Sequence, residues 1–426
     1  MTSRASSSTA STAATTLAAD PSRLWPYDGS CSADALRPTG WSPSPFREFI
    51  VKVQSRCNLN CDYCYVYNLG DESWRLQPRQ VSATTTEAIA ASIREHALGH
   101  GFDSVLISLH GGEPLLRGIE PVRDFVTTVR DALHPVGVQF SMQTNATLVT
   151  RPVAEELRSL DIGVGASIDG TASASDRHRL SPSGRSSFAR TRAGIEHLAA
   201  VPGLLQGLLC VIDVHNDPVE TYEFLAGLGA PSIDFLLPHG HWDERPTGKS
   251  LSTPDGPGSE APYADWLIAA YEAWAADSPK RVRVRIFEDI VHLCLGGQHT
   301  YEGLGVHPAQ LLVIEANGDI ELVDHLKSSY DGATRTGLSV LDHSLDTALE
   351  HPGVVCRQLG LDGLSAVCQQ CPAARICGAG LISHRYSSAT GFRSPTVYCS
   401  DMFKLIGHIR DDLAVRARHV LDARAA

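Results

Sequence analysis

The chain has 426 residues, and 43% of them are hydrophobic, which is enough to bury the core of one large domain and a smaller one. Its net charge of −12 argues against a nucleic-acid-binding protein, because such proteins normally present a basic face. No run of 18 or more apolar residues occurs, so we expect no membrane-spanning segment and no membrane partner.

The eleven cysteines indicate site chemistry rather than a disulfide scaffold. Their number is odd, the chain is large, and the N-terminal stretch lacks the apolar centre of a secretory signal. We therefore expect a cytoplasmic protein whose thiolates bind a metal or an iron–sulfur cluster. The Ser/Thr/Ala-rich beginning predicts a disordered leader and a connecting segment over 1–46.

From residue 47 onward, short apolar segments alternate with amphipathic ones. The predicted strands, with the turns that follow them, span 48–53, 104–114, 138–147, 162–170, 204–213 and 232–238. The predicted helices between them span 84–101, 119–133, 151–160, 187–201 and 217–229. This alternation predicts an α/β fold with a parallel sheet. Because six units are fewer than the eight of a closed barrel, we expect a partial (β/α)6 barrel over 47–240, with a doubly wound open sheet as the alternative.

Three cysteines follow the first strand directly. Cys57, Cys61 and Cys64 lie in "CNLNCDYC", in the loop where barrels of this class carry their chemistry. Three thiolates on a [4Fe–4S] cluster leave one iron free for a substrate or cofactor, whereas a fourth cysteine closes an electron-transfer cluster. Two alternatives remain open: three small residues on one helix face, or a zinc or electron-transfer module without catalysis, which requires a fourth ligand nearby.

The sequence "CNLNCDYCY" resembles the signature of radical S-adenosylmethionine (SAM) enzymes, whose fold is a partial barrel of this kind. The resemblance implies that the three cysteines hold a SAM-binding [4Fe–4S] cluster. It also implies that an electron from an external reductant, such as a flavodoxin or ferredoxin, cleaves SAM to give a 5′-deoxyadenosyl radical. Seven residues match cofactor-binding positions of the family: Tyr63, Gly111, Gly112, Glu113, Asn145, Ser167 and Arg179.

The resemblance gives several of these residues specific roles. Glu113, in "GGEP", would meet the SAM amino group, and the glycines before it permit close backbone approach. Ser167 would hold the ribose, Arg179 would pair with the SAM carboxylate, and Tyr63 would lie over the adenine. Each of these residues also has a purely structural alternative. The two glycines could form a plain turn, Arg179 could be a surface arginine, and Tyr63 could pack within its loop.

Residues 241–304 are predicted to connect the barrel to the C-terminal part. Their first part, 241–262, is rich in Pro, Gly and Ser and reads as a mobile loop, and a helical region follows over 263–297. The aromatic residues here could line a peptide path, although helical spacing favours a core position for some of them. They are Trp242, Trp266, Tyr271 and Trp274.

A cysteine-dense region runs from 305 to 402, before a predicted C-terminal helix over 403–426. Cys368, Cys371 and Cys377 lie close together in "CQQCPAARIC", and Cys399 follows in "VYCSD". Four thiolates close a site, and on spacing alone zinc and a [4Fe–4S] cluster are about equally favoured. Beside a radical SAM core, the region resembles the SPASM extension, which implies an auxiliary [4Fe–4S] cluster.

The region departs from the usual SPASM pattern, which carries two auxiliary clusters. A predicted β-hairpin turns at Asn317 and Gly318. Val323 and Leu381 stand where that pattern has cysteines, and no cysteine precedes the hairpin nearby, so we predict one auxiliary cluster. Asp324 is the candidate catalytic residue, because the equivalent aspartate in some relatives receives a proton from substrate. A solvated aspartate beside a hairpin is the alternative.

Longer stretches, such as "FLLPHGHWD" and "GFRSPTVYC", resemble FxsB-type radical SAM/SPASM peptide maturases, over about 38–410. This resemblance implies a ribosomally made precursor peptide as substrate and a cyclophane as product, in which an aromatic ring carbon is joined to a side-chain Cβ. The auxiliary cluster would accept an electron and Asp324 a proton when the ring regains aromaticity. The alternative products are a thioether, an epimerised residue or an oxidised side chain.

Overall fold

The computed structural model describes residues 24–249, 260–298 and 302–425. Most of the predicted disordered leader (1–23) and part of the predicted mobile loop (250–259) lie outside the described residues. In the connecting segment, Trp25 and Cys31 are buried, and the Trp25 carbonyl accepts a hydrogen bond from the backbone N–H of Phe392. This segment is therefore attached to the C-terminal part of the chain.

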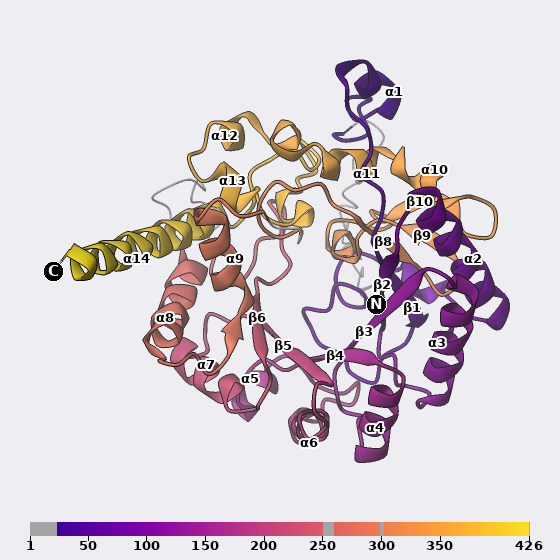
Figure 1. Ribbon diagram of the computed structural model, residues 1–426, viewed down its shortest axis with the longest axis horizontal. Helices are drawn as coiled ribbons and strands as arrows, with labels where there is room; N and C mark the ends of the chain where they lie inside the picture. Colours follow the sequence, from indigo (N-terminus) through magenta and orange to yellow (C-terminus); the bar gives the residue numbers. More distant parts are fainter. Residues whose placement is uncertain (1–23, 250–259, 299–301, 426) are drawn as a thin grey trace, which may run out of the picture.

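One ten-stranded sheet runs through the described residues in the order β10-β9-β8-β1-β2-β3-β4-β5-β6-β7 (Figure 1). All pairs from β8–β1 through β6–β7 are parallel, and the β8–β9 and β9–β10 pairs are antiparallel. The strands are β1 (Glu48–Gln54), β2 (Ser104–Gly111), β3 (Gly137–Thr144), β4 (Ile162–Ser167), β5 (Leu205–Val211), β6 (Ser232–Leu236), β7 (Arg283–Val284), β8 (Leu311–Ile314), β9 (Asp319–Glu321) and β10 (Arg335–Ser339). All six strands predicted for the barrel are present.

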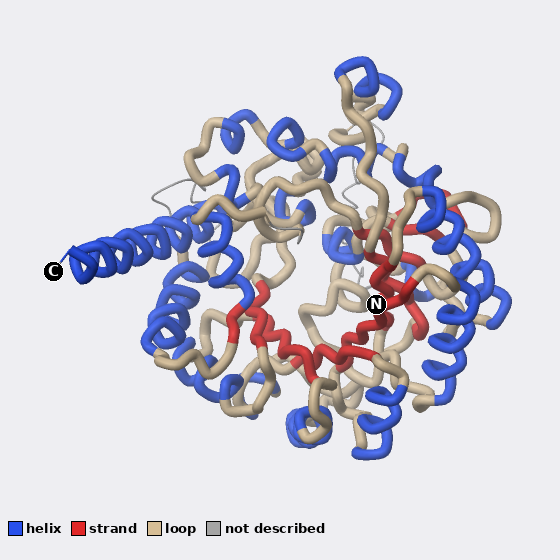
Figure 2. The backbone as a smooth tube through the Cα atoms, in the orientation of Figure 1, coloured by secondary structure: helices blue, strands red, loops and turns tan. Residues whose placement is uncertain are grey.

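The helices that connect the barrel strands lie around the outside of the curved sheet (Figure 2). A doubly wound sheet would carry helices on both faces, so the partial barrel is the form that the chain adopts. The helices are α1 (Ala33–Leu36), α2 (Ala83–Gly99), α3 (Glu120–Leu133), α4 (Arg151–Ser159), α5 (Ala172–Ser175), α6 (Phe188–Ala199), α7 (Pro218–Ala226), α8 (Pro262–Ala276), α9 (Arg285–Cys294), α10 (Leu345–Leu349), α11 (Pro352–Val355), α12 (Ala366–Gln369), α13 (Ala374–Cys377) and α14 (Cys399–Ala425).

Strand β1 is buried because it has neighbours on both edges and helices behind it. Phe49, Val51 and Val53 belong to the main hydrophobic core, as expected for a β-branched run in a parallel sheet. Lys52 lies among them and is itself buried. A buried ammonium group requires a partner, so this position points to chemistry at the carboxyl end of the sheet.

The predicted hairpin is present, but its place in the sheet was not predicted. Strand β8 pairs with β9, and it also pairs in parallel with β1, with Glu48 opposite Leu311 and Val51 opposite Ile314. The hairpin therefore continues the barrel sheet beyond β1. Local sequence patterns predict strands but do not show which distant strands pair, so this pairing could not be predicted.

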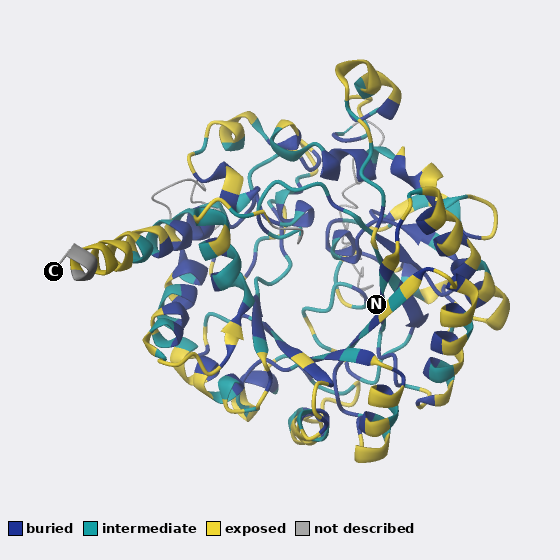
Figure 3. Cartoon of the chain, in the orientation of Figure 1, coloured by how far each residue is buried: buried dark blue, intermediate teal, exposed yellow. Residues whose placement is uncertain are grey.

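Helix α14 is 27 residues long and projects from the body of the protein, with its outer part exposed (Figure 3). Helices α8 and α9 account for the predicted helical region, and the short strand β7 between them pairs with β6. Among the described residues, no helix is both long and apolar enough to cross a membrane.

Candidate active site

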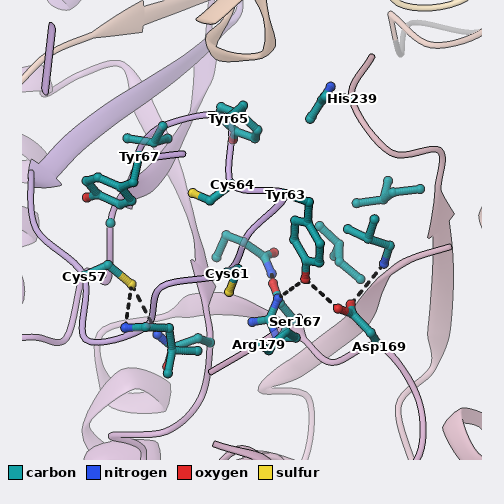
Figure 4. A pocket seen from close by; sticks show the side chains of 18 of the residues that line it. Cys57, Cys61, Tyr63, Cys64, Tyr65, Tyr67, Ser167, Asp169, Arg179 and His239 are labelled. Carbon is teal, nitrogen blue, oxygen red and sulfur yellow. Dashed lines mark hydrogen bonds between the residues drawn. The ribbon is translucent and has the colours of Figure 1, made fainter. Parts of the chain in front are cut away.

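The cysteine loop at the carboxyl end of β1 lines a cavity of about 200 Å³, here called the cysteine-loop cavity (Figure 4). The thiols of Cys61 and Cys64 lie near that of Cys57. Burial raises the pKa of Cys57 to about 12, and the nearby Glu113, Cys64 and Cys61 add to this rise. Three thiols on one short loop thus face the same space.

A buried triad stands next to these thiols. The Tyr63 hydroxyl donates to Asp169 Oδ2 at 2.5 Å and accepts from the Arg179 guanidinium at 2.7 Å (Figure 4). The second carboxylate oxygen of Asp169 accepts the backbone N–H of Val211 at 3.1 Å, which attaches the triad to the end of β5. The three side chains line the cysteine-loop cavity and fix one another's positions.

Two further predicted residues lie where neighbouring strands end. Ser167 ends β4 and accepts a hydrogen bond from Gln143 Nε2 at 2.8 Å. Asn145 follows β3, and its side-chain amide donates to Asn58 at 2.9 Å and to Cys57 Sγ at 3.7 Å. Asn145 therefore holds the cysteine loop in position as well as lining the cavity.

The glycines Gly111 and Gly112 both line the cavity, but close packing against the cysteine loop requires them. A Cβ on Gly111 would lie 1.9 Å from the backbone oxygen of Gln54, and this glycine has φ of +145°. A Cβ on Gly112 would lie 2.1 Å from the Tyr67 hydroxyl and 2.4 Å from the Arg56 backbone. These contacts set the position of the cysteine loop relative to the end of β2.

Glu113 does not join the other predicted residues in the lining of the cavity. It is fully buried, and its Oε1 accepts from the Thr144 hydroxyl (2.8 Å) and the Leu115 N–H (3.1 Å). Its Oε2 accepts the N–H of Asn145 at 2.8 Å. This carboxylate therefore holds the end of β3 in position, and the expected contact with the SAM amino group stays a prediction.

A second cavity of about 370 Å³, here called the inner cavity, occupies the barrel interior and reaches the C-terminal region. It shares six lining residues with the cysteine-loop cavity, so the two spaces adjoin: Tyr65, His110, Leu209, Leu236, Leu237 and His239. Val323 and Leu381 also line the inner cavity. Apolar side chains thus form part of its wall where the SPASM pattern has cluster ligands.

Asp324 lies in the wall of the inner cavity and not in solvent. Its Oδ2 lies 2.5 Å from Lys52 Nζ and 3.8 Å from His110 Nδ1, and Lys52 Nζ donates to His110 Nδ1 at 3.0 Å. Burial alone would raise the pKa of Asp324, but Lys52, Lys327 and His110 together hold it below its ordinary value. The group is therefore a buried, ionised carboxylate beside the space that both cavities share.

The four C-terminal cysteines lie on or next to short helices. Cys368 lies in α12, Cys377 ends α13, Cys399 begins α14, and Cys371 lies between α12 and α13. Burial raises the pKa of Cys377 to about 12, and the nearby thiols of Cys399 and Cys368 add to this rise. These thiols approach one another although their residues are up to 31 positions apart in the chain.

Sequence reasoning missed several residues of the site, including Lys52, His110 and His239, and it gave Asp169 no role. Lys52 carried a signal, because a lysine in a strand expected to be buried must have a charged partner. His239, in "PHGH", follows the sixth predicted strand, where this fold carries its chemistry. Nothing in the local sequence marks His110 as a neighbour of Asp324.

The aromatic residues suggested for a peptide path pack elsewhere. None of them lines the cysteine-loop cavity or the inner cavity. The indole N–H groups donate to the backbone carbonyls of Pro395 (from Trp242), Asn216 (from Trp266) and Val282 (from Trp274). The helical spacing indicated core packing correctly.

The residues of the cysteine-loop cavity fit the expected cluster and SAM. Cys57 Sγ accepts from the backbone N–H of Leu59 at 3.4 Å and from Asn145, which suits the anionic thiolate of a cluster ligand. Arg179 is buried, and its Nε–H has no hydrogen-bond partner in the described residues. An unused donor on a buried guanidinium suits the carboxylate of an amino-acid cofactor.

Comparisons with known proteins find a family model and relatives that this chain resembles. Residues 51–225 match the model of the radical SAM superfamily. The chain is 22% identical to the serine-type anaerobic sulfatase-maturating enzyme of Bacteroides thetaiotaomicron, in a match that covers 92% of this chain and 96% of that protein.

Two solved structures resemble the fold. The structure of anSMEcpe with bound AdoMet aligns with a TM-score of 0.73 at 19% identity, covering 88% of this chain and 99% of that one. Streptococcus suis SuiB bound to the precursor peptide SuiA aligns with a TM-score of 0.56 at 14% identity, covering 86% and 78%. The family match and these likenesses confirm the predicted fold class, an α/β radical SAM barrel with a cysteine-rich C-terminal region. They do not single out the FxsB-type subfamily.

Proposed function

We propose that this radical SAM enzyme, whose cofactors are SAM and a [4Fe–4S] cluster, modifies a ribosomally made precursor peptide and joins an aromatic ring carbon to a side-chain Cβ. The observation that carries the proposal is the inner cavity, which adjoins the cysteine-loop cavity and has a buried carboxylate in its wall. Its volume of about 370 Å³ lies within the range of roughly 300–1,000 Å³ for small-ligand sites. Such a space suits side chains of a peptide, not a folded protein.

SAM bound to its cluster would supply the chemistry that abstracts a hydrogen atom from an unactivated C–H bond. The electron that starts this chemistry would come from an external flavodoxin-like or ferredoxin-like protein. Cys57, Cys61 and Cys64 would hold that cluster. Arg179 and Ser167 would hold the amino-acid and ribose parts of SAM, and Tyr63 would lie beside the adenine. The triad of Tyr63, Asp169 and Arg179 keeps these groups in fixed positions before any cofactor arrives.

Asp324 would accept the proton that the aromatic ring releases when the new bond is complete. The carboxylate is ionised and lies in the wall of the inner cavity, so it is available as a base. Lys52 orients it and stabilises its charge. The proton leaves a ring that regains aromaticity, so even a carboxylate of low pKa is basic enough. Cys368, Cys371, Cys377 and Cys399 would hold one auxiliary [4Fe–4S] cluster, which would accept the accompanying electron.

A second candidate is oxidation of one side chain of a peptide. The relatives that match most of this chain carry the names serine-type and cysteine-type anaerobic sulfatase-maturating enzyme, which favours it. Solved structures of similar fold were determined with peptides, among them Cp18Cys and the SuiA precursor. These names are the support for a peptide substrate in either candidate.

The test is to co-express the chain with the short open reading frame next to its gene and to analyse the peptide by mass spectrometry. A cyclophane loses two hydrogens and suppresses fragmentation between the joined residues. An oxidised serine also loses two hydrogens, but it fragments normally and reacts with a hydrazide. An unchanged mass with an inverted residue would indicate epimerisation, and a cross-link that involves a cysteine would indicate a thioether. Either of these results would overturn the cyclophane.

A further inference from the structure

His96, in the last turn of α2, and His100, the C-cap residue of that helix, face an aspartate on α10. His96 Nδ1 lies 2.5 Å from Asp346 Oδ1, and His100 Nε2 lies 3.0 Å from the same oxygen. The three ligand atoms lie within 4.8 Å of one another. None of these residues lines the cysteine-loop cavity or the inner cavity, so they form a separate group on the outside of the barrel.

The proton on His96 can be assigned from its other neighbour. His96 Nε2 lies 3.1 Å from the backbone oxygen of Phe46. A carbonyl oxygen only accepts, so Nε2 carries the hydrogen, and Nδ1 of the neutral ring carries a lone pair. That lone pair faces a carboxylate oxygen. Two acceptors at this distance repel one another unless a cation lies between them.

We propose that His96 Nδ1, His100 Nε2 and Asp346 Oδ1 bind a divalent transition-metal ion of the zinc class. Histidines at positions i and i+4 of a helix lie on one face and can bind one ion together. The hydrogen bond from His96 to the Phe46 carbonyl is the outer-shell contact that usually orients a ligating imidazole. Asp346 is exposed, so water has access to the fourth position of a tetrahedral site.

Protons alone could also satisfy these contacts, if His96 were an imidazolium and the neutral His100 ring carried its hydrogen on Nε2. The convergence of both imidazoles on one carboxylate oxygen is the arrangement that a shared metal ion would use. The His96 side chain is only 1% exposed, and a bound metal ion would hold its imidazole in the neutral form that coordinates. Ligands of a tetrahedral zinc site lie roughly 3.3 Å apart, so the exposed Asp346 has to move only slightly.

A second group of possible metal ligands in the described residues consists of three carboxylates, and it differs from the histidine group in its partners. Glu315 and Glu321 also lie within ligand distance of Asp324. There, however, the Lys327 ammonium lies 2.6 Å from Glu315 and 2.9 Å from Glu321, and Lys52 pairs with Asp324. Protein cations already neutralise that group. No lysine or arginine forms an ion pair with Asp346 in the described residues, where the two histidines are its ionic partners.

A metal ion at this position would join the barrel to the C-terminal region. Helix α2 follows the cysteine loop in the chain, and α10 follows the edge strand β10. In the part of the chain that the structure describes, one other side-chain hydrogen bond joins α2 to the β10 end: it runs from Ser92 Oγ to the Val340 carbonyl at 3.4 Å, at the limit of a hydrogen bond. The proposed role is therefore to hold the hairpin end of the sheet against α2.

The test measures zinc in the anaerobically prepared holoprotein after dialysis against a buffered zinc solution. We expect wild-type protein to retain one more equivalent of zinc than either His100→Gln or Asp346→Asn, with the same iron content in all three. Zinc should also raise the melting temperature of the wild type and not that of the two variants. His419→Gln, on the exposed part of α14, is the matched histidine control and should behave as the wild type.

Equal zinc content in wild type and both variants would overturn the proposal, because zinc would then bind elsewhere, for example at cysteines that lack iron. Zinc content that falls in only one variant would reduce the site to fewer ligands and would also overturn it. Iron content and visible absorption report whether each variant is folded. Asp346→Asn, at an exposed position, keeps the test valid if His100→Gln loses iron.

Discussion

Lys52 and Asp324 form the charged contact on which the proposed proton transfer depends. Both side chains are buried, and their charged atoms lie 2.5 Å apart, next to His110. Burying either charge alone is unfavourable, so each group stabilises the ionised form of the other. The pair also brings two distant segments together, because Lys52 lies on β1 and Asp324 follows β9.

Replacing Asp324 with asparagine should separate proton transfer from the earlier chemistry. We expect Asp324→Asn to lower the rate of peptide product formation by roughly a hundredfold or more, because a positioned base contributes about that much. Cleavage of SAM should continue, so the ratio of peptide product to 5′-deoxyadenosine should fall. Both products can be measured in one reaction by liquid chromatography and mass spectrometry.

The matched control is Glu321→Gln. Glu321 is also buried and also pairs with a lysine, Lys327, at 2.9 Å, but it does not line the inner cavity. We expect this variant to lose stability and to keep the ratio of product to 5′-deoxyadenosine. A wild-type ratio in Asp324→Asn, or an equal loss in both variants, would exclude the proton-accepting role.

At the scale of elements, the ends of the strands and the caps of the short helices hold the site together. Gly112 lets the end of β2 approach the cysteine loop, and Glu113 holds the end of β3. His351 is the N-cap residue of α11, and its Nδ1 accepts a hydrogen bond from the N–H of Gly353 at 3.1 Å. These contacts are local, and each can be tested by one substitution.

Gly112→Ala should disturb the cysteine loop. The new Cβ would lie 2.4 Å from the Arg56 backbone, which cannot move away as a flexible side chain could. We expect a loss of about 1–3 kcal/mol in the free energy of unfolding and a lower iron content. Gly407→Ala in α14 is the control: its Cβ meets no atom within 4 Å, so a gain of about 0.5–1 kcal/mol is expected. Denaturant titration and iron analysis measure both effects.

His351 predicts a pH dependence of stability. Burial lowers its pKa to about 4, from an ordinary value of 6.5. Between these values the unfolded chain binds a proton that the folded chain does not. The histidine therefore destabilises the fold as pH falls from 6.5 to 4, by at most about 1.4 kcal/mol per pH unit. Asparagine can cap the helix but does not titrate, so His351→Asn should flatten this part of the stability profile.

Denaturant titrations at several pH values compare the two proteins. The difference in unfolding free energy between His351→Asn and wild type should change steadily below pH 6.5 and stay constant above it. A constant difference for His351→Asn at all pH values would show that His351 titrates alike in the folded and unfolded chains.

The elements also show how far the sequence predicts this protein. The six barrel strands and the helices between them follow from local apolar patterns, and the hairpin follows from its Asn-Gly turn. The pairing of β8 with β1, the two-residue strand β7 and the contact of His110 with Asp324 depend on distant segments. The three local hydrogen bonds of Glu113 are also absent from its motif, because their donors follow from the fold around the end of β3.

At the scale of the whole molecule, the two sets of cysteines occupy different parts of the fold. The cysteine loop follows β1, and the C-terminal set lies on α12 to α14. The inner cavity lies between the two parts, since its lining includes residues of the barrel strands as well as Gly380, Leu381 and His384. The proposed roles of the two clusters can therefore be separated by mutation.

Cys61→Ala and Cys371→Ala should have different effects. Each should lower the iron content by about half, if each set holds one [4Fe–4S] cluster. We expect Cys61→Ala to abolish SAM cleavage, and Cys371→Ala to keep it while the peptide product is lost. Cys294→Ala, outside both sets, should keep iron, cleavage and product. Cleavage of SAM at the wild-type rate by Cys61→Ala would contradict the assignment of the cysteine loop.

The parallel pairing of β8 with β1 has a consequence for synthesis of the protein. As the chain leaves the ribosome, β1 can pair with β2 early, but its other edge stays open until residues 311–314 emerge. The nascent chain therefore presents an uncovered strand edge next to the cysteine loop for most of translation, and such edges favour misassociation. The sheet is therefore completed late in translation, and the cysteine loop reaches its final surroundings only then.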